Sequence, residues 1–124
     1  MDAESLREFF EPAGPVSIRK MFGALGVYAD GLCIACLIRG ELFMKGDARS
    51  EAEFLAAGCG QWTYQHAGSG KVVKMPYWRL TESAHDDPAE LKRWSELALQ
   101  AARRQQAEKA AIVTRKPKKS ANPP

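Results

Sequence analysis

The segment from Arg19 to Gly31 constrains the fold more than any other part of the sequence. It reads R-K-M-F-G-A-L-G-V-Y-A-D-G and ends in the pair Asp30-Gly31. An Asp-Gly pair between apolar runs predicts a two-residue hairpin, because a type I′ turn needs positive φ at both central residues. Gly23 and Gly26 lie in otherwise extended chain, where glycine marks a bulge or a close backbone approach. The segment therefore predicts an antiparallel hairpin.

Strand patterns continue from this hairpin into a larger antiparallel sheet. Arg39-Gly40 predicts a second two-residue turn, and Pro76 puts the last strand at a sheet edge or gives it a bulge. We predict a four-stranded meander followed by a two-stranded hairpin, with strands at Val16–Phe22, Val27–Ala29, Leu32–Ile38, Glu41–Lys45, Gln61–His66 and Lys71–Arg79.

Two-residue turns fix the strand register. Ala29 then faces Leu32, Val27 faces Ile34, Cys36 faces Phe43 and Leu37 faces Leu42. One face of the meander would carry Val27, Leu32, Ile34, Cys36, Ile38 and Phe43, and the other Tyr28, Cys33, Ala35, Leu37, Leu42 and Met44. Both faces are apolar, so each needs a cover: a helix, a second subunit or a partner protein.

Three helices are predicted, each preceded by an aspartate that can cap it: Asp2, Asp47 and Asp87. The last helix has the strongest signals, because Pro88 takes its first position and Glu90 stands where a capping box needs it. Its apolar face carries Leu91, Trp94 and Ala98. The pattern ends near residue 112, so we predict one domain over residues 1–112 and a basic disordered tail over 113–124.

The short apolar runs, the acidic start of the chain and the low cysteine content predict a cytoplasmic protein that does not span a membrane. No apolar run approaches the ~20 residues of a membrane span, and the acidic start of the chain does not fit a secretory signal. Three cysteines are too few for a disulfide framework. The net charge of +3 comes from the C-terminal end, where seven cations stand against Glu108: Arg103, Arg104, Lys109, Arg115, Lys116, Lys118 and Lys119.

Cys33 and Cys36 have the spacing of a redox or zinc pair. The register above places them on opposite faces of a central strand, because residues three apart in a strand alternate sides. Cys59, His66 and His85 supply no second metal-binding pair. We therefore interpret the two cysteines as small core residues and predict no metal and no cofactor.

Catalytic motifs are not found in this sequence: it contains no nucleophile elbow, phosphate-binding loop or dinucleotide fingerprint. We predict no catalytic residues. An acid–base pair assembled in space stays an open alternative, with a ligand pocket between the last helix and the sheet near Tyr28, Tyr77 and Trp94.

Aromatic and basic residues alternate on the last two predicted strands. Trp62, Tyr64, Tyr77 and Trp78 accompany Lys71, Lys74 and Arg79. Such a surface can stack the bases of single-stranded nucleic acid, whereas strand alternation favours aromatics packed under the helices with the lysines outside. The tail cations Arg115, Lys116, Lys118 and Lys119 could add phosphate contacts without sequence preference.

These residues, taken together, resemble the TfoX N-terminal domain family, also called TfoX/Sxy-like. The resemblance runs from about residue 5 to residue 105 and rests on the segments R-K-M-F-G (19–23), G-V-Y (26–28), D-G (30–31), L-F-M-K (42–45), W-T-Y (62–64), M-P-Y-W (75–78) and D-P (87–88), with Phe54, Gly58, Leu91 and Trp94.

The resemblance implies an α+β fold of secretion-chaperone type, in the order helix, four strands, helix, two strands, helix. It also implies a regulator of natural competence that works with the cyclic-AMP receptor protein at promoters. Full-length family members carry a second domain that this sequence does not match. The family has no established catalytic residues, and related folds often form dimers.

Three hypotheses follow. The first is a non-catalytic cytoplasmic protein that acts in transcriptional regulation by contacting a protein partner or itself as a homodimer, through Arg19, Lys20 and Lys45. The second is nucleic-acid binding through the tail and the strand at 71–79. The third is a small-ligand binder or an enzyme of unknown reaction.

Overall fold

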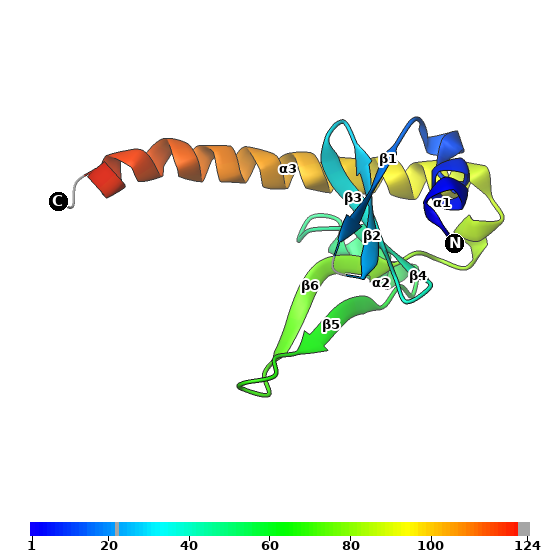
Figure 1. The fold of residues 1–124 in the computed structure, drawn as a ribbon, viewed down its shortest axis with the longest axis horizontal. Coiled ribbons are helices and arrows are strands. Elements are labelled where there is room, and N and C mark those ends of the chain that lie inside the picture. Colours follow the sequence, from blue (N-terminus) through cyan, green and yellow to red (C-terminus); the bar gives the residue numbers. More distant parts are fainter. Residues whose placement is uncertain (22, 122–124) are drawn as a thin grey trace.

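Six antiparallel strands form one sheet, with helices against one of its faces and a long final helix that projects beyond it (Figure 1). The computed structural model describes residues 1–21 and 23–121. It confirms the predicted α+β class with an antiparallel sheet. The strand order is β1-β2-β3-β4-β6-β5, so β1 and β5 are the two edges.

The elements follow the chain with short connections. The helices are α1 (Ala3–Phe9), α2 (Glu51–Ala56) and α3 (Pro88–Ala121), with short 3-10 turns at Glu11–Ala13 and Ser83–His85. The strands are β1 (Ser17–Met21), β2 (Ala24–Ala29), β3 (Leu32–Ile38), β4 (Glu41–Lys45), β5 (Gln61–Gln65) and β6 (Val72–Arg79).

The two predicted hairpin turns have the expected backbone. Asp30 and Gly31 have φ of 52° and 76°, and Arg39 and Gly40 have φ of 51° and 80°. Positive φ at both central residues is the signature of a type I′ turn. Ala29 lies opposite Leu32, Cys36 opposite Phe43 and Leu37 opposite Leu42, as predicted.

The register between β2 and β3 differs from the prediction at one position. Val27 pairs with Ala35 rather than with Ile34, while Tyr28 pairs with Cys33. Ile34 is therefore an extra residue in β3, a β-bulge that lets two consecutive residues point to the same side. Ile34 and Ala35 are both buried in the main core, at 2% and 0% exposure.

The bulge overturns the predicted opposite placement of Cys33 and Cys36. Both cysteines belong to the second hydrophobic cluster, on the face away from the main core, and their Sγ atoms are 4.0 Å apart. The two predicted face lists are wrong for the same reason, because Val27 and Ile34 lie with Leu37, Leu42 and Met44 in the main core.

All three helices pack on one side of the sheet. Leu6 and Phe10 near α1, Phe54 of α2, and Leu91, Trp94 and Ala98 of α3 are buried in the main core. Phe54 stacks between two tryptophans, with ring centroids 5.1 Å from Trp78 and 4.8 Å from Trp94. This stack joins α2, β6 and α3.

Two of the three predicted caps are found and the third is displaced. Asp2 accepts a hydrogen bond from the Ser5 N–H at 2.8 Å, and Asp87 accepts from the N–H groups of Ala89 and Glu90. Asp47 does not cap α2, because that helix begins later, with Ser50 at the N-cap position. The Asp47 carboxylate instead accepts from the Ser50 N–H across the turn before α2.

Glu90 does not form the predicted capping box. Its carboxylate accepts hydrogen bonds from the hydroxyl groups of Thr81 and Ser83 and from the indole of Trp94. It therefore ties the loop before α3 to the second turn of that helix.

α3 continues through the segment predicted as a disordered tail, as far as Ala121. Local sequence does not predict this continuation, because Ile112, Val113 and Thr114 have lower helix propensity and Pro117 disfavours a helix interior. The last three residues of that predicted tail lie outside the described residues. In the part of the chain that the structure describes, no helix has both the length and the apolar character needed to cross a membrane.

Candidate functional site

The side of the sheet opposite the helices carries its own hydrophobic cluster, which we call the open face. Its members come from strands only, as far as the described residues go: Met21, Cys33, Cys36, Ile38, Phe43, Trp62, Met75 and Tyr77. The pairing of Phe43 with Arg79 and of Lys45 with Tyr77 places both cations on the same side. The open face is thus an apolar surface that the described helices leave uncovered.

A row of aromatic rings crosses the open face from β4 to β5. Trp62 is at its centre, with ring centroids 6.1 Å from Phe43, 6.3 Å from Tyr77 and 6.4 Å from Tyr64. Phe43 and Tyr77 are buried, whereas the side chain at the outer end, Tyr64, is 45% exposed. The rings of the row are therefore buried at its β4 end and exposed to solvent at its outer end on β5.

Tyr28 lies over Gly26 at the other end of the open face. A Cβ at Gly26 would come within 2.6 Å of Met21 Sδ and 2.9 Å of Tyr28 Cε1, and the Tyr28 hydroxyl donates to Met21 Sδ at 3.6 Å. This is the close backbone approach predicted for Gly26. Arg19 stacks above the Tyr28 ring, 4.7 Å from its centroid.

The three cations predicted as a contact surface are not brought together. Arg19 and Lys20 are successive residues of β1, so their side chains point to opposite faces. Lys45 is only 7% exposed, and it donates a hydrogen bond to the Tyr77 hydroxyl at 3.4 Å. Burial lowers the pKa of Lys45, and this lysine is not available as an exposed contact.

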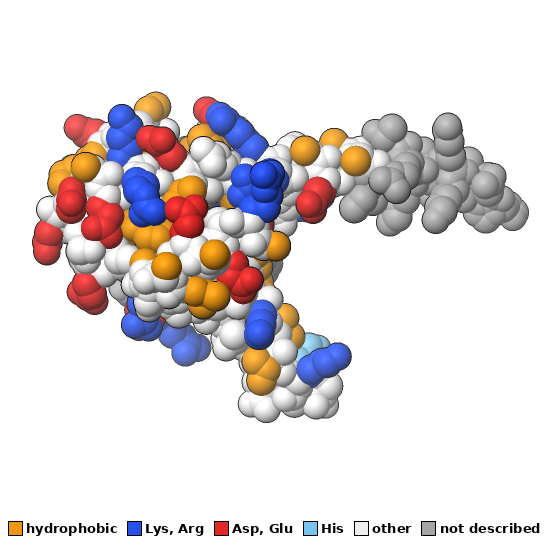
Figure 2. All heavy atoms as spheres, turned by 180° about the vertical axis from the view of Figure 1, so that it is seen from behind, with side chains coloured by type: hydrophobic (Ala, Val, Ile, Leu, Met, Phe, Trp, Pro, Cys, Tyr) orange, Lys and Arg blue, Asp and Glu red, His pale blue; other side chains and the backbone are white. Residues whose placement is uncertain are grey.

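The residues predicted to bind nucleic acid are also dispersed. Lys71 and Lys74 are exposed on the β5–β6 hairpin, which projects from the body with cationic side chains along it (Figure 2). Arg79 instead forms an ion pair with Glu41 at 2.6 Å. The side chains of Arg115, Lys116, Lys118 and Lys119 lie outside the described part of the structure.

The predicted alternation of aromatics and lysines is correct only in part. Trp78 packs under the helices, 3% exposed, whereas Trp62, Tyr64 and Tyr77 lie on the open face. Pro76 falls where the β5–β6 register shifts, between the pairs Gln61–Trp78 and Thr63–Lys74. The bulge alternative predicted from this proline is therefore the one observed.

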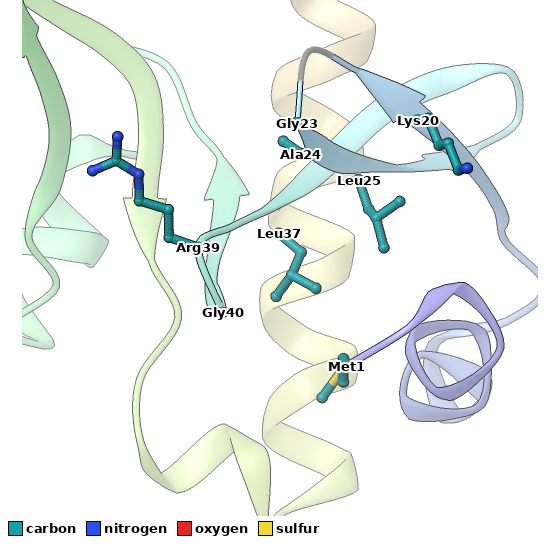
Figure 3. A pocket seen from close by; sticks show the side chains of 8 residues that line it. All are labelled: Met1, Lys20, Gly23, Ala24, Leu25, Leu37, Arg39 and Gly40. Atoms are coloured by element: carbon teal, nitrogen blue, oxygen red, sulfur yellow. The ribbon is translucent and has the colours of Figure 1, made fainter.

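The predicted ligand pocket between α3 and the sheet is not formed by the residues proposed for it. Tyr28 and Tyr77 lie on the open face and Trp94 in the main core. A separate depression of about 420 Å³ lies between the β2–β3 side of the sheet and the N-terminus. Leu25 and Leu37 form its floor, while Lys20 and Arg39 lie at opposite ends (Figure 3).

Metal coordination finds no support among the described residues, which contain no cluster of three or more histidine, cysteine or carboxylate side chains. His66 holds the β5–β6 turn, where its Nδ1 accepts from the N–H groups of Gly68 and Ser69. His85 packs against the ring of Phe9, with centroids 5.5 Å apart.

Comparison with known proteins identifies the family. The model of the TfoX N-terminal domain matches residues 8–102, which is most of the described sheet and helices. The chain belongs to the TfoX N-terminal domain family. The matched range includes β1 and β2, and with them Gly26 and the Tyr28 end of the open face.

One relative of this TfoX N-terminal domain is a DNA transformation protein, TfoX1, of Aliivibrio fischeri. The two are 25% identical over 88 residues, which is 71% of this chain and 41% of the relative. The chain therefore spans less than half the length of this curated relative. Whatever the remainder of the relative contributes is not represented by the matched segment.

Proposed function

We propose that this chain is a non-catalytic cytoplasmic protein that binds another protein through the open face and thereby regulates transcription in DNA uptake. The observation that carries this proposal is an apolar face of the sheet, with a row of aromatic rings, that the described helices leave uncovered. Exposed apolar patches of this kind mark interaction sites. Aromatic residues are the side chains that most often dominate binding at such sites.

The proposed role in DNA uptake is supported by the family comparison. The similar DNA transformation protein of A. fischeri supports a role in DNA uptake, and membership of the TfoX N-terminal domain family supports the same role. The described cysteines are all free thiols, which suits a reducing compartment.

The charge around the open face favours a particular kind of partner. Arg19 is exposed at the Tyr28 end of this face, and no ion pair among the described residues includes it. We therefore expect a protein partner with an apolar centre and acidic residues around it, because complementary rim charges steer association.

A complementation experiment tests the proposal. A strain that lacks the gene receives the wild type, Tyr64→Ser or the control Val72→Ser, and transcripts are measured together with transformation frequency. Val72 is 63% exposed on the same hairpin but alternates to the other side from the Tyr64–Val73 pair. Loss of an aromatic anchor should weaken the contact by roughly tenfold or more.

We expect the wild type and Val72→Ser to restore the transcripts of DNA-uptake genes, and Tyr64→Ser to fail. Full restoration by Tyr64→Ser, or no transcript change on deletion, would contradict the proposal. Sedimentation of the purified protein identifies the partner class: a concentration-dependent dimer that Tyr64→Ser dissociates would replace the separate partner with a second copy of this chain.

A further inference from the structure

The two thiols that the β3 bulge brings together form a site that neither the family nor the proposed function accounts for. Cys33 Sγ and Cys36 Sγ are 4.0 Å apart on one side of the strand, and both are free thiols. A disulfide needs about 2.05 Å between the sulfur atoms. Closing the bond therefore requires rotation of the two side chains together with movement of the bulged strand.

The surroundings of Cys33 stabilise its thiolate. The Tyr77 hydroxyl donates to Cys33 Sγ at 3.5 Å, and the Lys45 ammonium donates to the Tyr77 hydroxyl at 3.4 Å. Tyr77 and Lys45 thus supply a hydrogen-bond donor and a positive charge close to the Cys33 sulfur atom. The hydrogen bond from Cys36 and these neighbours lower the pKa of Cys33 to about 6, although burial opposes the shift.

The partner thiol has the opposite character. Hydrogen bonding to the Cys33 thiolate raises the pKa of Cys36, as does burial, so Cys36 keeps its proton while Cys33 is ionised. On the neighbouring strands, burial and the two thiols raise the pKa of Tyr28, and Arg19 lowers it. From α3, Lys109 acts on Lys45. A low-pKa thiolate beside a protonated thiol is the arrangement of reactive dithiol pairs.

Access from solvent also differs between the two thiols. Cys33 is half-buried and borders a depression of about 170 Å³. Lys45 and the α3 residues Gln105, Gln106 and Lys109 line this depression. Cys36 is 2% exposed. An external reagent therefore reaches Cys33 first, in a depression where Lys109 and two amides suit a carboxylate-bearing molecule.

We propose that Cys33 and Cys36 are a redox-active dithiol that is oxidised by small anionic disulfides, with Cys33 as the attacking thiol and Cys36 as the resolving thiol. In the first step the Cys33 thiolate attacks one sulfur of the disulfide, and the other sulfur leaves as a thiolate. In the second step Cys36 gives its proton to the thiolate released in the first step and attacks Cys33 Sγ, closing the Cys33–Cys36 bond and expelling the second thiolate. The protein loses two electrons and the small disulfide gains them.

The test uses the full chain, reduced and then incubated with glutathione disulfide at neutral pH, followed by intact mass and peptide mapping. The wild type should lose the mass of two hydrogen atoms and yield a cross-linked Cys33–Cys36 peptide. Cys36→Ser should stop at a glutathione adduct on Cys33, and Cys33→Ser should form no adduct at Cys36. Cys59 is the internal control, because burial raises its pKa and it lies in the main core.

A wild type that stays reduced would overturn the proposal, as would modification of Cys59 ahead of Cys33 or a wild type that stops at the mixed disulfide.

Tyr77→Phe removes the hydroxyl between Lys45 and the thiolate and keeps the packed ring. We expect it to raise the apparent pKa in the pH profile of Cys33 alkylation and to slow alkylation at neutral pH several-fold. An unchanged profile would contradict the assigned environment. The dithiol stands or fails independently of the protein partner proposed above.

Discussion

The carboxylate of Asp47 links two elements of the fold through an ion pair with Arg104. Asp47 receives two hydrogen bonds from Arg104, from Nε to Oδ2 at 2.6 Å and from Nη2 to Oδ1 at 2.9 Å. Both side chains are about a quarter exposed, at 26% and 29%. The pair therefore links the turn before α2 to α3 in a partly desolvated position, where a bidentate contact contributes more than at the surface.

Replacing Asp47 by Asn should make unfolding less dependent on acid pH. The hydrogen bond from Arg104 lowers the Asp47 pKa to about 2, with Ser50 adding to the shift. A carboxyl whose pKa is depressed in the folded state stabilises the protein above the unfolded pKa of about 3.9, and this stability is lost as pH falls toward 2. We expect Asp47→Asn to cost roughly 2 kcal/mol near pH 7 and almost nothing near pH 2.

Urea unfolding across this pH range measures the difference. The control is Asp30→Asn, because Asp30 also pairs with an arginine of α3, Arg103, but its side chain is 64% exposed. An exposed pair of this kind contributes little, and asparagine suits the positive φ of the turn. If Asp47→Asn and Asp30→Asn lost equal stability at every pH, the assigned role of the Asp47–Arg104 pair would be wrong.

Among the elements, the aromatic stack of Phe54, Trp78 and Trp94 holds α2, β6 and α3 against one another. It needs a residue without a side chain where the chain leaves β4. A Cβ at Gly46 would meet Trp78 Cζ3 at 2.6 Å and Phe54 Cε2 at 2.8 Å. Phe54 is packed on both faces by the two tryptophans, and a close-packed core leaves little room for its ring to shift.

We therefore expect Gly46→Ala to destabilise the protein by about 1–3 kcal/mol, the usual cost of overpacking a core. Gly60→Ala is the matched control, since a Cβ there would meet no atom within 4 Å and its φ is not in the left-handed region. That change should leave stability equal or slightly higher. Urea unfolding followed by tryptophan fluorescence separates the two; an equally stable Gly46→Ala would show that the rings can move apart.

Sequence patterns predicted the turns and the cap of α3 correctly, but they did not predict the bulge in β3. Asp30-Gly31, Arg39-Gly40 and Asp87-Pro88 are local signals whose meaning does not depend on distant contacts, and the structure has the expected turns and cap at all three. The β3 bulge falls at Ile34, a β-branched residue that favours regular strands. Nothing local marks it, because the bulge is decided by how β2, β3 and the helices pack together.

The extra residue of this bulge explains why the proximity of Cys33 and Cys36 was not predicted. Strand alternation separated Cys33 from Cys36, and the bulge returns them to one side. The same alternation correctly put Phe43 with Cys36, because the bulge lies outside that part of the ladder. Alternation along β5 could also have placed Trp62 and Tyr64 on one face, a signal that pointed to the aromatic row.

At the scale of the whole molecule, the sheet has one face under helices and one face of exposed strands. The helices bury Trp94 and Trp78 at 2% and 3% exposure. The open face leaves Tyr64 at 45% exposure with Trp62 half-buried beside it. Both the proposed partner contact and the proposed dithiol depend on this asymmetry.

Oxidative footprinting of the purified full chain with hydroxyl radicals, read by mass spectrometry, tests the asymmetry most directly. We expect Tyr64 and Trp62 to be oxidised readily, and Trp78 and Trp94 to be protected by at least several-fold, because only the first two contact solvent appreciably. Protection of Tyr64 and Trp62 equal to that of Trp94 in the dilute protein would contradict the existence of an open face.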